Sequence, residues 1–434
     1  MSKALALITS LPSDFVDYAG RGKDAPPADT LRSSLIALEK LGLDCSFDVF
    51  RNRALIGGAF LKEVNPASDD SERPEVSDPI VLGLRELIAA NFGFEPSARM
   101  MQDAVMRACH KRSFHPIKDY FAGLTWDGLP RVEFLLRDYF NAPPTPFNRA
   151  VSRCVMMASV RRIKVPGTKF DYMTVLQSEE GYDKSSAIKA LYGEDNFTDA
   201  TTIGLSRRDT EEVLRGMWAQ ESPELQGISK TDWNKFKAQI STQNDRSRRV
   251  FDRNPIDAKR TAIQWGTAND DTYLRALSGM NRRFFSVDVL KSCDVTKIIA
   301  DRDQLWAEAV EMEAAGESVM LPEKFWADAN AERLKRTEDD PWEDILSKVG
   351  KVNAGVTPEP SDYEVIRDEM LGDEERVSSS YLFDLLGFAA GHTRLPHHGS
   401  HIARVMKKLG WTYRRGNVRI GPASCKGYTR PLFE

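Results

Sequence analysis

Hydrophobic positions recur with a helical period in the first quarter of the chain. Across Pro79–His110 the apolar residues are spaced three and four apart, which predicts two amphipathic helices. The preceding run Ala54–Gly58 predicts a short strand, and the stretch rich in Pro, Ser, Asp and Glu around Asn65–Asp78 predicts a loop. We therefore expect residues 1–118 to form a mixed, mainly helical region.

The pattern changes in the middle of the chain, where short apolar runs lack polar alternation. Such runs occur at Tyr172–Leu176, Met217–Gln220 and Ala262–Gly266, as expected for strands buried on both faces of a parallel sheet. The residues Ser185–Tyr192 follow a helical pattern that ends at Gly193. Strands that alternate with helices predict an α/β fold with a layered sandwich core over residues 119–336.

A third pattern follows an acidic, interrupted segment at residues 337–376, which predicts a linker. Residues 377–434 then show the order helix, turn, helix and two-stranded wing, which is typical of a winged-helix domain. The predicted elements are helices over Ser378–Leu386 and His397–Leu409, and a hairpin that pairs Trp411–Arg415 with Val418–Ile420 around Gly416 and Asn417.

The charge balance limits where a nucleic acid can bind. The 434 residues carry a formal net charge of −4, so no global excess of positive charge attracts a polyanion. Residues 394–434, however, hold nine Lys and Arg against one acid, which favours DNA binding by the C-terminal domain. On its second helix we expect Ile402, Val405, Met406 and Leu409 to pack inward. The expected DNA-facing residues of this domain are His397, Ser400, His401, Arg404, Lys408, Arg414 and Arg415.

The cysteines and the apolar runs bear on the compartment. The five cysteines lie far apart without a C-x-x-C pair, which is typical of free thiols in a reducing environment. The N-terminus lacks the apolar core of a signal peptide, and no run of about 18 apolar residues occurs. We expect a cytoplasmic protein that does not contact a membrane.

A phosphate-binding loop is predicted at Ser178–Ser185, between a strand and a helix. In this context backbone N–H groups and the helix N-terminus point at phosphate oxygens. Lys184 is then placed to reach the β- and γ-phosphates of ATP, and Ser185 to ligate Mg²⁺. The remaining expected nucleotide contacts are Gly181, Asp183 and Ser186. The alternative interpretation is an ordinary turn with a solvated lysine.

The loop departs from the pattern G-x-x-x-x-G-K-[ST] at both outer positions, which hold Ser178 and Asp183. Asp tolerates the left-handed conformation that glycine normally supplies. A carboxylate about 6 Å from a phosphate would cost roughly 3 kcal/mol at an effective dielectric constant near 20. We therefore expect Asp183 to point away from the nucleotide or to be paired, with Lys189 or an arginine as partner.

Several motifs in a fixed order connect this loop to a known family. The order of these segments resembles the virulence-associated protein E family over about Tyr120–Trp342. That resemblance implies a P-loop ATPase core, related to superfamily 3 helicases and phage primase-helicases, that uses ATP and Mg²⁺. The segments are Trp126–Arg131, Pro166–Met173, the loop itself, Leu214–Trp218, Glu221–Leu225, Gly266–Asn269 and Gly279–Phe284.

The resemblance also implies catalytic roles. Glu221 and Glu224 take the Walker B roles, in which one carboxylate holds Mg²⁺ and the other orients the attacking water. Asn269 matches a polar sensor, and Arg282 or Arg283 an arginine finger acting within the subunit or across an interface. Each residue also has an ordinary interpretation, because such glutamates, turn-forming asparagines and surface arginines are common without function.

The interval between the Walker B and sensor segments is rich in arginine. Superfamily 3 enzymes, which the family resembles, place a DNA-contacting hairpin there. The residues expected to contact phosphates are Arg246, Arg248, Arg249, Arg253, Lys259 and Arg260, with Phe251 available to stack on a base. Some of these arginines could instead face nucleotide, and the segment could also be a solvated basic loop.

These observations lead to one main hypothesis and two alternatives. The main one is an ATP-hydrolysing, helicase-like motor of a phage or mobile element that acts on DNA in replication as a homo-oligomeric ring. The first alternative is a DNA-binding interaction or regulatory protein whose altered loop has lost efficient catalysis. The second is a non-replicative NTPase of phage defence or pathogenicity-island regulation.

Overall fold

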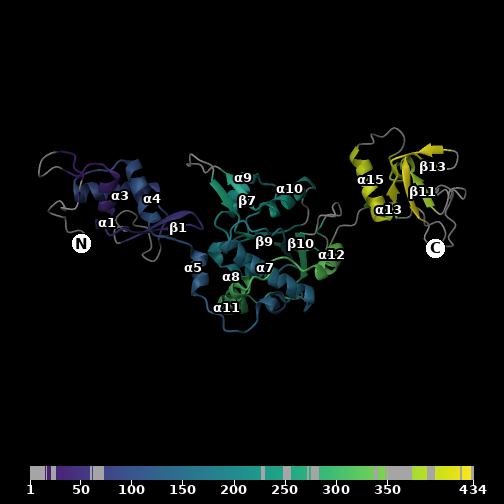
Figure 1. Cartoon of the computed structure of the whole chain (residues 1–434), viewed down its shortest axis with the longest axis horizontal. Helices are drawn as coiled ribbons and strands as arrows, with labels where there is room; N and C mark the ends of the chain where they lie inside the picture. Colours follow the sequence, from purple (N-terminus) through teal and green to yellow (C-terminus); the bar gives the residue numbers. More distant parts are fainter. Residues whose placement is uncertain are drawn as a thin grey trace. The chain divides into compact units, whose positions relative to one another are not determined.

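The computed structural model describes residues 15, 17–20, 26–58, 61, 73–225, 230–247, 256–270, 273–274, 283–336, 341–347, 349, 374–388, 396–420 and 423–431. The chain divides into two compact units, Met1–Tyr273 with Met280–Arg336, and Leu274–Gly279 with Thr337–Glu434. Figure 1 labels many of the elements of both units. Across the described part of the chain, no helix is long and apolar enough to cross a membrane.

The N-terminal part of the first unit has a hydrophobic core of its own. The two helices predicted across Pro79–His110 are confirmed as α3 and α4, and the predicted strand is β2. Ile56, Leu84 and Val105 are fully buried in this core. The elements are α1 (Leu31–Lys40), β1 (Asp44–Asp48), β2 (Arg53–Gly57), α3 (Asp78–Phe92), α4 (Ala98–His110) and β3 (Ser113–Phe114), with sheet order β2-β1-β3.

The central part of the first unit is built on a five-stranded parallel sheet with the order β10-β4-β9-β6-β5. Every residue of β4, β6 and β9 is buried, as the uninterrupted apolar runs predicted. The strands are β4 (Met173–Gln177), β5 (Phe197–Thr198), β6 (Ala219–Ser222), β9 (Ile263–Ala268) and β10 (Phe284–Asp288). The helices are α5 (Pro116–Gly123), α6 (Leu135–Asp138), α7 (Pro146–Lys164), α8 (Lys184–Tyr192), α9 (Arg207–Leu214), α10 (Lys230–Ile240), α11 (Val295–Ala314) and α12 (Trp326–Lys335).

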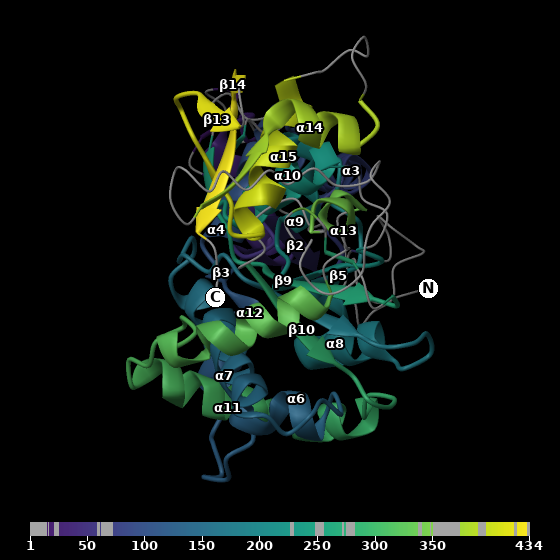
Figure 2. The same ribbon diagram turned by 90° about the vertical axis from the view of Figure 1, so that its right-hand side faces the viewer.

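Helices cover both faces of this sheet. Successive residues of a strand point to opposite faces of the sheet, so the contacts of two neighbouring residues in β10 identify the helices on the two faces. Phe284 stacks on Trp233 of α10 with ring centroids 5.1 Å apart, whereas Phe285 contacts the ring of Phe147 of α7 at 6.3 Å. In two perpendicular views α7, α8 and α11 lie on one side of the strands, and α9 and α10 lie on the other (Figures 1 and 2).

Strand β6 begins two residues later than its hydrophobic pattern predicted. Gly216 has a φ of 68°, and the Met217 N–H donates to the Leu214 carbonyl, so the chain is still turning there. The extended backbone begins only at Ala219, and Glu221 therefore lies inside the strand rather than beyond it. Strand β9 likewise extends past its predicted end, to Ala268.

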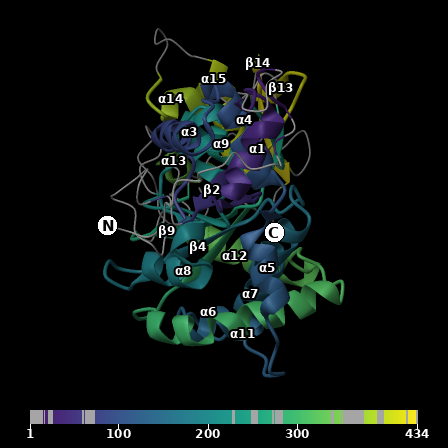
Figure 3. The same cartoon turned by 90° about the vertical axis from the view of Figure 1, so that its left-hand side faces the viewer.

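Helix α8 is fixed at its C-terminal end by buried hydrogen bonds. The Tyr192 hydroxyl lies 2.8 Å from the Ser159 hydroxyl and accepts a bond from the Trp265 indole N–H at 3.2 Å. The Trp306 indole N–H donates to the Leu191 carbonyl at 2.9 Å. Because buried indole and phenol groups need such partners, these bonds orient α8 against α7, β9 and α11 (Figure 3). The opposite end of the helix, which carries the predicted loop, is thereby held at the sheet.

In its described residues the second unit combines three helices with two small sheets. Ile402, Val405 and Met406 are buried in its core, as predicted for the inner face of α15, and Leu409 packs against it. The elements are α13 (Pro341–Leu346), β11 (Glu374–Ser378), α14 (Ser379–Leu385), α15 (Pro396–Lys408), β12 (Thr412–Tyr413), β13 (Val418–Ile420), β14 (Ala423–Cys425) and β15 (Gly427–Pro431). The antiparallel sheet has the order β11-β15-β12, and β13 pairs with β14.

The predicted pairing of Trp411–Arg415 with Val418–Ile420 is wrong. Strand β12 pairs with β15, so that Tyr413 lies opposite Tyr428 and the two rings pack 5.1 Å apart. Gly427 permits β11 to pair on the other side of β15, because a Cβ atom at Gly427 would lie 2.4 Å from the Val377 carbonyl oxygen of β11. The long-range pairing packs the Tyr413 ring against the buried ring of Tyr428, and such cross-strand aromatic pairs stabilise a sheet.

Candidate nucleotide-binding site

The loop between β4 and α8 turns back on itself at the carboxyl edge of the sheet. Gly181 and Asp183 both have left-handed backbone conformations, with φ values of 79° and 52°. Asp183 is the N-cap of α8 but makes no side-chain capping bond. The first helical N–H groups, those of Lys184, Ser185 and Ser186, have no acceptor within the helix. This end of α8 therefore has the geometry of an anion site.

Asp183 is held by the loop that follows β10. Its carboxylate accepts a hydrogen bond from the Ser292 hydroxyl at 2.6 Å, and the Cys293 N–H donates to the Tyr182 carbonyl at 3.0 Å. The expected partner Lys189 instead forms an ion pair with Glu194, so that part of the prediction is wrong. The left-handed conformation expected of Asp183 is confirmed, and its carboxylate is paired with a hydroxyl group.

Lys184 is directed into the loop. Its ammonium group donates to the Ser178 hydroxyl at 2.7 Å, to the carbonyls of Ser178 and Glu179 at 3.1 Å, and to the Asn269 side-chain oxygen at 3.0 Å. The residue is only 7% exposed, and this burial lowers the pKa of Lys184. A solvated lysine in an ordinary turn is therefore excluded. The same contacts place Asn269, directly after β9, beside the loop.

Glu221 lies next to the start of α8. One of its oxygens accepts hydrogen bonds from the hydroxyls of Ser185 and Thr267, each at 2.7 Å. The residue is fully buried, and its other oxygen has no hydrogen-bond partner. Burial raises the pKa of Glu221, and the two hydroxyl bonds oppose that shift. An orphaned carboxylate oxygen costs roughly 1–3 kcal/mol or more, which a bound cation would offset.

The oxygens of Ser185 and Glu221 fit a magnesium ion, which prefers hard oxygen ligands and keeps several waters. In the described part of the chain, no three His, Cys, Asp or Glu side chains gather closely enough to hold a metal by themselves. A magnesium ion here would consequently take its remaining ligands from water and phosphate oxygens.

The two other predicted catalytic residues in the described part of the chain, Glu224 and Arg283, lie at opposite edges of the sheet. Glu224 is exposed two residues beyond β6, with a left-handed φ of 50°. Arg283 precedes β10, whose first residue Phe284 lies opposite Met173 at the amino edge of the sheet. The loop is at the carboxyl edge, so the structure does not bring Arg283 to the loop. Arg282 lies outside the described residues.

Sequence reasoning missed a buried arginine that fixes the strand leading into the loop. Arg336 donates from Nε to the Gln177 side-chain oxygen at 2.7 Å and forms ion pairs with Asp288 and Glu332. Gln177 and Asp288 are the last residues of β4 and β10, and they lie opposite each other. Nothing in the sequence indicated this contact, because Arg336 is 159 residues away from Gln177.

A hairpin is present in the arginine-rich interval, as the resemblance implied. Strands β7 (Asn244–Ser247) and β8 (Ile256–Lys259) pair antiparallel, with Arg246 opposite Asp257. The Arg260 guanidinium is buried and donates to the Gln239 carbonyl, so its predicted phosphate contact is wrong and it anchors the hairpin base instead. Lys259 is exposed. The predicted contacts Arg248, Arg249, Phe251 and Arg253 lie outside the described residues.

The second unit also corrects part of the predicted DNA-facing set. His401 stacks on Trp342 of α13 with ring centroids 4.2 Å apart, so it does not face outward freely. Lys408 forms an ion pair with Glu343, and Arg414 forms one with Glu374. Arg415 and Ser400 are exposed, Arg404 is half-buried, and the surroundings of His397 lie outside the description. Short-range periodicity could not show that α13 covers one side of α15.

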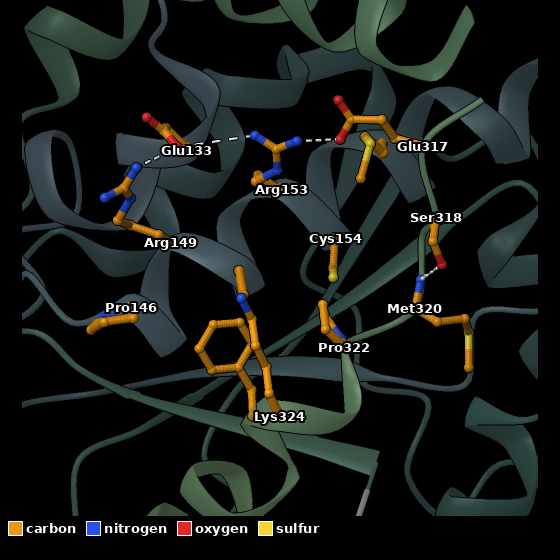
Figure 4. A pocket seen from close by; sticks show the side chains of 13 residues that line it. Glu133, Pro146, Arg149, Arg153, Cys154, Glu317, Ser318, Met320, Pro322 and Lys324 are labelled. Carbon is orange, nitrogen blue, oxygen red and sulfur yellow. Dashed lines mark hydrogen bonds and ion pairs between the residues drawn. The ribbon is translucent and has the colours of Figure 1, made fainter. Parts of the chain in front are cut away.

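A cavity of about 480 Å³ on α7 is distinct from this site. Figure 4 shows Arg153 between Glu133 and Glu317, and Arg149 beside Glu133. The arginines and glutamates that line this cavity are therefore paired with one another, and the Lys324 ammonium group lies over the Phe325 ring.

Comparisons with known proteins bear on this geometry. Sequence patterns of the Virulence-associated protein E-like domain match residues 121–338. No curated protein matches the chain. Among solved structures, the apo C-terminal region (305–718) of NrS-1 is 10% identical, with 92% of this chain and 98% of that chain covered and a TM-score of 0.49. The active helicase Cch of SCCmec type IV is 11% identical, with coverages of 90% and 93% and a TM-score of 0.35. Since the matched domain spans half of the chain and confirms the resemblance seen in the sequence, this protein belongs to the virulence-associated protein E-like family.

Proposed function

We propose that this protein binds ATP and Mg²⁺ at the β4–α8 loop and uses hydrolysis to drive a helicase-like motor on DNA during replication of a phage or mobile element. One observation carries the proposal. Lys184 and Ser185 come from the start of α8, Glu221 from β6 and Asn269 from the residue after β9, and their contacts bring them together at one edge of a parallel sheet. A P-loop ATPase of the AAA type needs this set of groups at this edge.

The surroundings of each residue indicate its role in binding and hydrolysing ATP. The N–H groups at the start of α8 and the Lys184 ammonium group hold the β- and γ-phosphates, and for this Lys184 exchanges its loop carbonyls for phosphate oxygens. The buried carboxylate of Glu221 and the Ser185 hydroxyl hold the metal. Bound Mg²⁺ neutralises charge that develops on the phosphates. Exposed Glu224 is then left to orient the attacking water, and Asn269 to sense the γ-phosphate.

The position of Arg283 favours assembly as a ring. This arginine lies at the edge of the sheet opposite its own loop. An arginine finger at this position can therefore reach a nucleotide only in a neighbouring subunit. The role of Arg283 as an arginine finger therefore requires the homo-oligomeric ring.

DNA contacts are proposed for both units. In the first unit they come from the β7–β8 hairpin, with exposed Lys259 at its base. In the second unit, α14 and α15 with the sheet β11-β15-β12 and the β13–β14 hairpin support a winged-helix domain. Arg415 is exposed on this domain and available to a phosphate.

ATP hydrolysis, measured with and without single-stranded DNA, tests the proposal. Lys184→Ala should lower turnover at least 100-fold, because the ammonium group no longer stabilises phosphate charge. Lys189→Ala is the matched control, since this exposed lysine lies on the same helix and pairs only with Glu194 among the contacts described. Absence of hydrolysis by the wild type under both conditions, or equal turnover by wild type and Lys184→Ala, refutes the motor function.

The hydrogen bonds that Lys184 makes within the loop favour a second function, which is DNA binding or regulation without efficient hydrolysis. The Lys184 ammonium group is already bonded to four loop and sensor oxygens, which a nucleotide must displace. Equilibrium binding of a fluorescent ATP analogue separates the two functions, since this alternative predicts binding without turnover. Unwinding of forked DNA separates the replicative motor from a defence or regulatory NTPase.

A further inference from the structure

A second cavity, of about 370 Å³, opens at the amino edge of the five-stranded sheet. Its walls come from the segment that enters β4, from Arg283 before β10, and from α12. On α12 the lining residues Trp326, Ala329 and Arg333 are spaced three and four apart, so they share one helical face. The cavity therefore lies at the edge opposite the nucleotide loop, and it belongs to a different site.

One wall of the cavity is an exposed aromatic ring held in place. Trp326 is 56% exposed, and its indole N–H donates to the Leu321 carbonyl at 3.3 Å. Tyr172 also lines the cavity, and it stacks on Phe285 with centroids 4.5 Å apart and planes 17° apart. A fixed, solvent-facing indole beside a cavity of this size suits stacking with a flat apolar ligand group.

The lining is also positively charged. Lys169, Arg283 and Arg333 face the cavity against the single carboxylate of Asp171. The Nε atom of Arg283 is buried without a hydrogen-bond partner. The charge of Arg283 also acts on Lys237, whose pKa is lowered first by burial and then by that charge. An anion bound here would reduce this repulsion between like charges.

Further buried charge lies at the same edge of the sheet. Arg162 is buried, and its guanidinium group donates to the carbonyls of Thr168, Phe170 and Ala262. Its pKa is lowered to about 10, first by burial and then by the charge of Arg260. These bonds connect the segment around exposed Lys169 to the residue before β9. The backbone on both sides of Lys169 is therefore held in place.

The chain segment that leads to the cavity also contacts the base of the hairpin. A Cβ atom at Gly167 would meet the side-chain oxygen of Asn244 at 3.1 Å and Cβ of Lys259 at 3.4 Å. The segment that begins at Gly167 therefore passes directly against β7 and β8 and then reaches Lys169 and the cavity within two residues. A strand of DNA contacting the hairpin at Lys259 has a basic surface to follow into the cavity.

We propose that this cavity binds one nucleotide of single-stranded DNA, with its base against Trp326 and its phosphate on Lys169 and Arg333. The inference rests on the proposed DNA-dependent function and adds a site that the loop and the hairpin do not supply. Single-stranded nucleic acid fits because its bases are free to stack, whereas those of a duplex are not. Net positive charge beside an indole matches a base with its phosphate better than it matches an apolar peptide.

The first experiment measures binding of a fluorescent oligothymidylate by anisotropy. Trp326→Ala should raise Kd about tenfold, because stacking contributes roughly 1–3 kcal/mol per base, and Trp326→Phe should lie between the two. Leu334→Ala is the matched control, since Leu334 lies on the same helix, is also 56% exposed and does not line the cavity. Lys169→Ala should flatten the salt dependence of log K by about 0.7, whereas Lys324→Ala, outside the cavity, should not.

The second experiment identifies the contact directly. Ultraviolet crosslinking to an oligonucleotide that contains 5-iodouracil, followed by mass spectrometry, should place an adduct on Trp326 or Tyr172. Equal affinities for Trp326→Ala and Leu334→Ala, with no adduct on either aromatic residue, overturn the inference. A change in oligomeric state by sedimentation, with DNA affinity unaltered, also overturns it and assigns the cavity to a protein partner.

The two proposals fail in distinguishable ways. If the wild type neither binds single-stranded DNA nor hydrolyses ATP, the proposed function fails and this inference fails with it. If the wild type and Leu334→Ala bind DNA and hydrolyse ATP while Trp326→Ala binds DNA equally well, only the cavity assignment is refuted.

Discussion

Replacing Glu221 by glutamine should stabilise the protein without ligand and abolish its stabilisation by ATP and Mg²⁺. In the structure one carboxylate oxygen accepts bonds from Ser185 and Thr267, while the other is buried without a partner. Glutamine keeps the first oxygen and replaces the charged orphan by a neutral amide, which is cheaper to bury. We expect a gain of about 1 kcal/mol, or about 2–4 °C in Tm for a domain of this size.

The effect of ligand has the opposite sign. At a concentration 100-fold above Kd, ATP with Mg²⁺ should stabilise the wild type by about 2.7 kcal/mol. Glu221→Gln should lose most of this gain, because the amide is a poor ligand for magnesium. Thermal unfolding followed by circular dichroism, with and without ATP and Mg²⁺, measures both effects in the same samples.

The pH dependence follows from the raised pKa of Glu221. A carboxyl group whose pKa is higher in the folded than in the unfolded state favours folding while it is protonated. That contribution is fully present below the unfolded pKa and is lost as pH rises through the folded pKa. As pH rises from acid towards neutral, the free energy of unfolding of Glu221→Gln should therefore increase relative to that of the ligand-free wild type. Above the folded pKa of Glu221, the difference between the two proteins should stay constant.

The refuting result is specific. If Glu221→Gln retains the ATP and Mg²⁺ stabilisation, the carboxylate does not hold the metal. If the variant is instead destabilised by several kcal/mol, Glu221 serves as an anchor for Ser185 and Thr267. Glu224→Gln is the control, because this exposed carboxylate should leave the Tm of the ligand-free protein unchanged.

Three further substitutions test other parts of the structure. Asp183→Asn should strengthen ATP binding by up to about tenfold in Kd, measured by calorimetry, because it keeps a residue tolerant of left-handed φ and removes a charge near the phosphates. Arg336→Ala should lower the free energy of unfolding of the first unit by about 2–3 kcal/mol in urea, since it removes the buried link between β4 and β10. Gly427→Ala should destabilise the second unit by about 1–3 kcal/mol, measured by hydrogen exchange, because its Cβ would collide with the Val377 carbonyl.

Each of these predictions has its own contradicting outcome. Unchanged ATP affinity in Asp183→Asn would mean that Ser292 already screens the carboxylate completely. A loss below about 0.5 kcal/mol in Arg336→Ala, the range of ordinary surface changes, would show that Arg336 does not fix the strand ends. Gly416→Ala is the control for Gly427→Ala, since a Cβ atom at Gly416 meets nothing within 4 Å; equal effects would contradict the steric argument.

The sequence by itself determined the local elements and the family. Uninterrupted apolar runs located β4 and β9, and helical spacing located α3, α4, α8 and α15, because burial requires those periods. The order of several short motifs identified the virulence-associated protein E-like domain, although the loop alone departs from the usual pattern at Ser178 and Asp183.

Only the tertiary structure decided how the site is assembled. Glu221 meets Ser185 because the turn at Gly216 delays the start of β6, and Asp183 meets Ser292 because β10 lies beside β4. The pairing of β12 with β15 and the covering of His401 by Trp342 likewise join residues far apart in the chain. Periodicity reports which face of an element is buried, but not which distant element buries it, because that choice depends on the packing of the whole core.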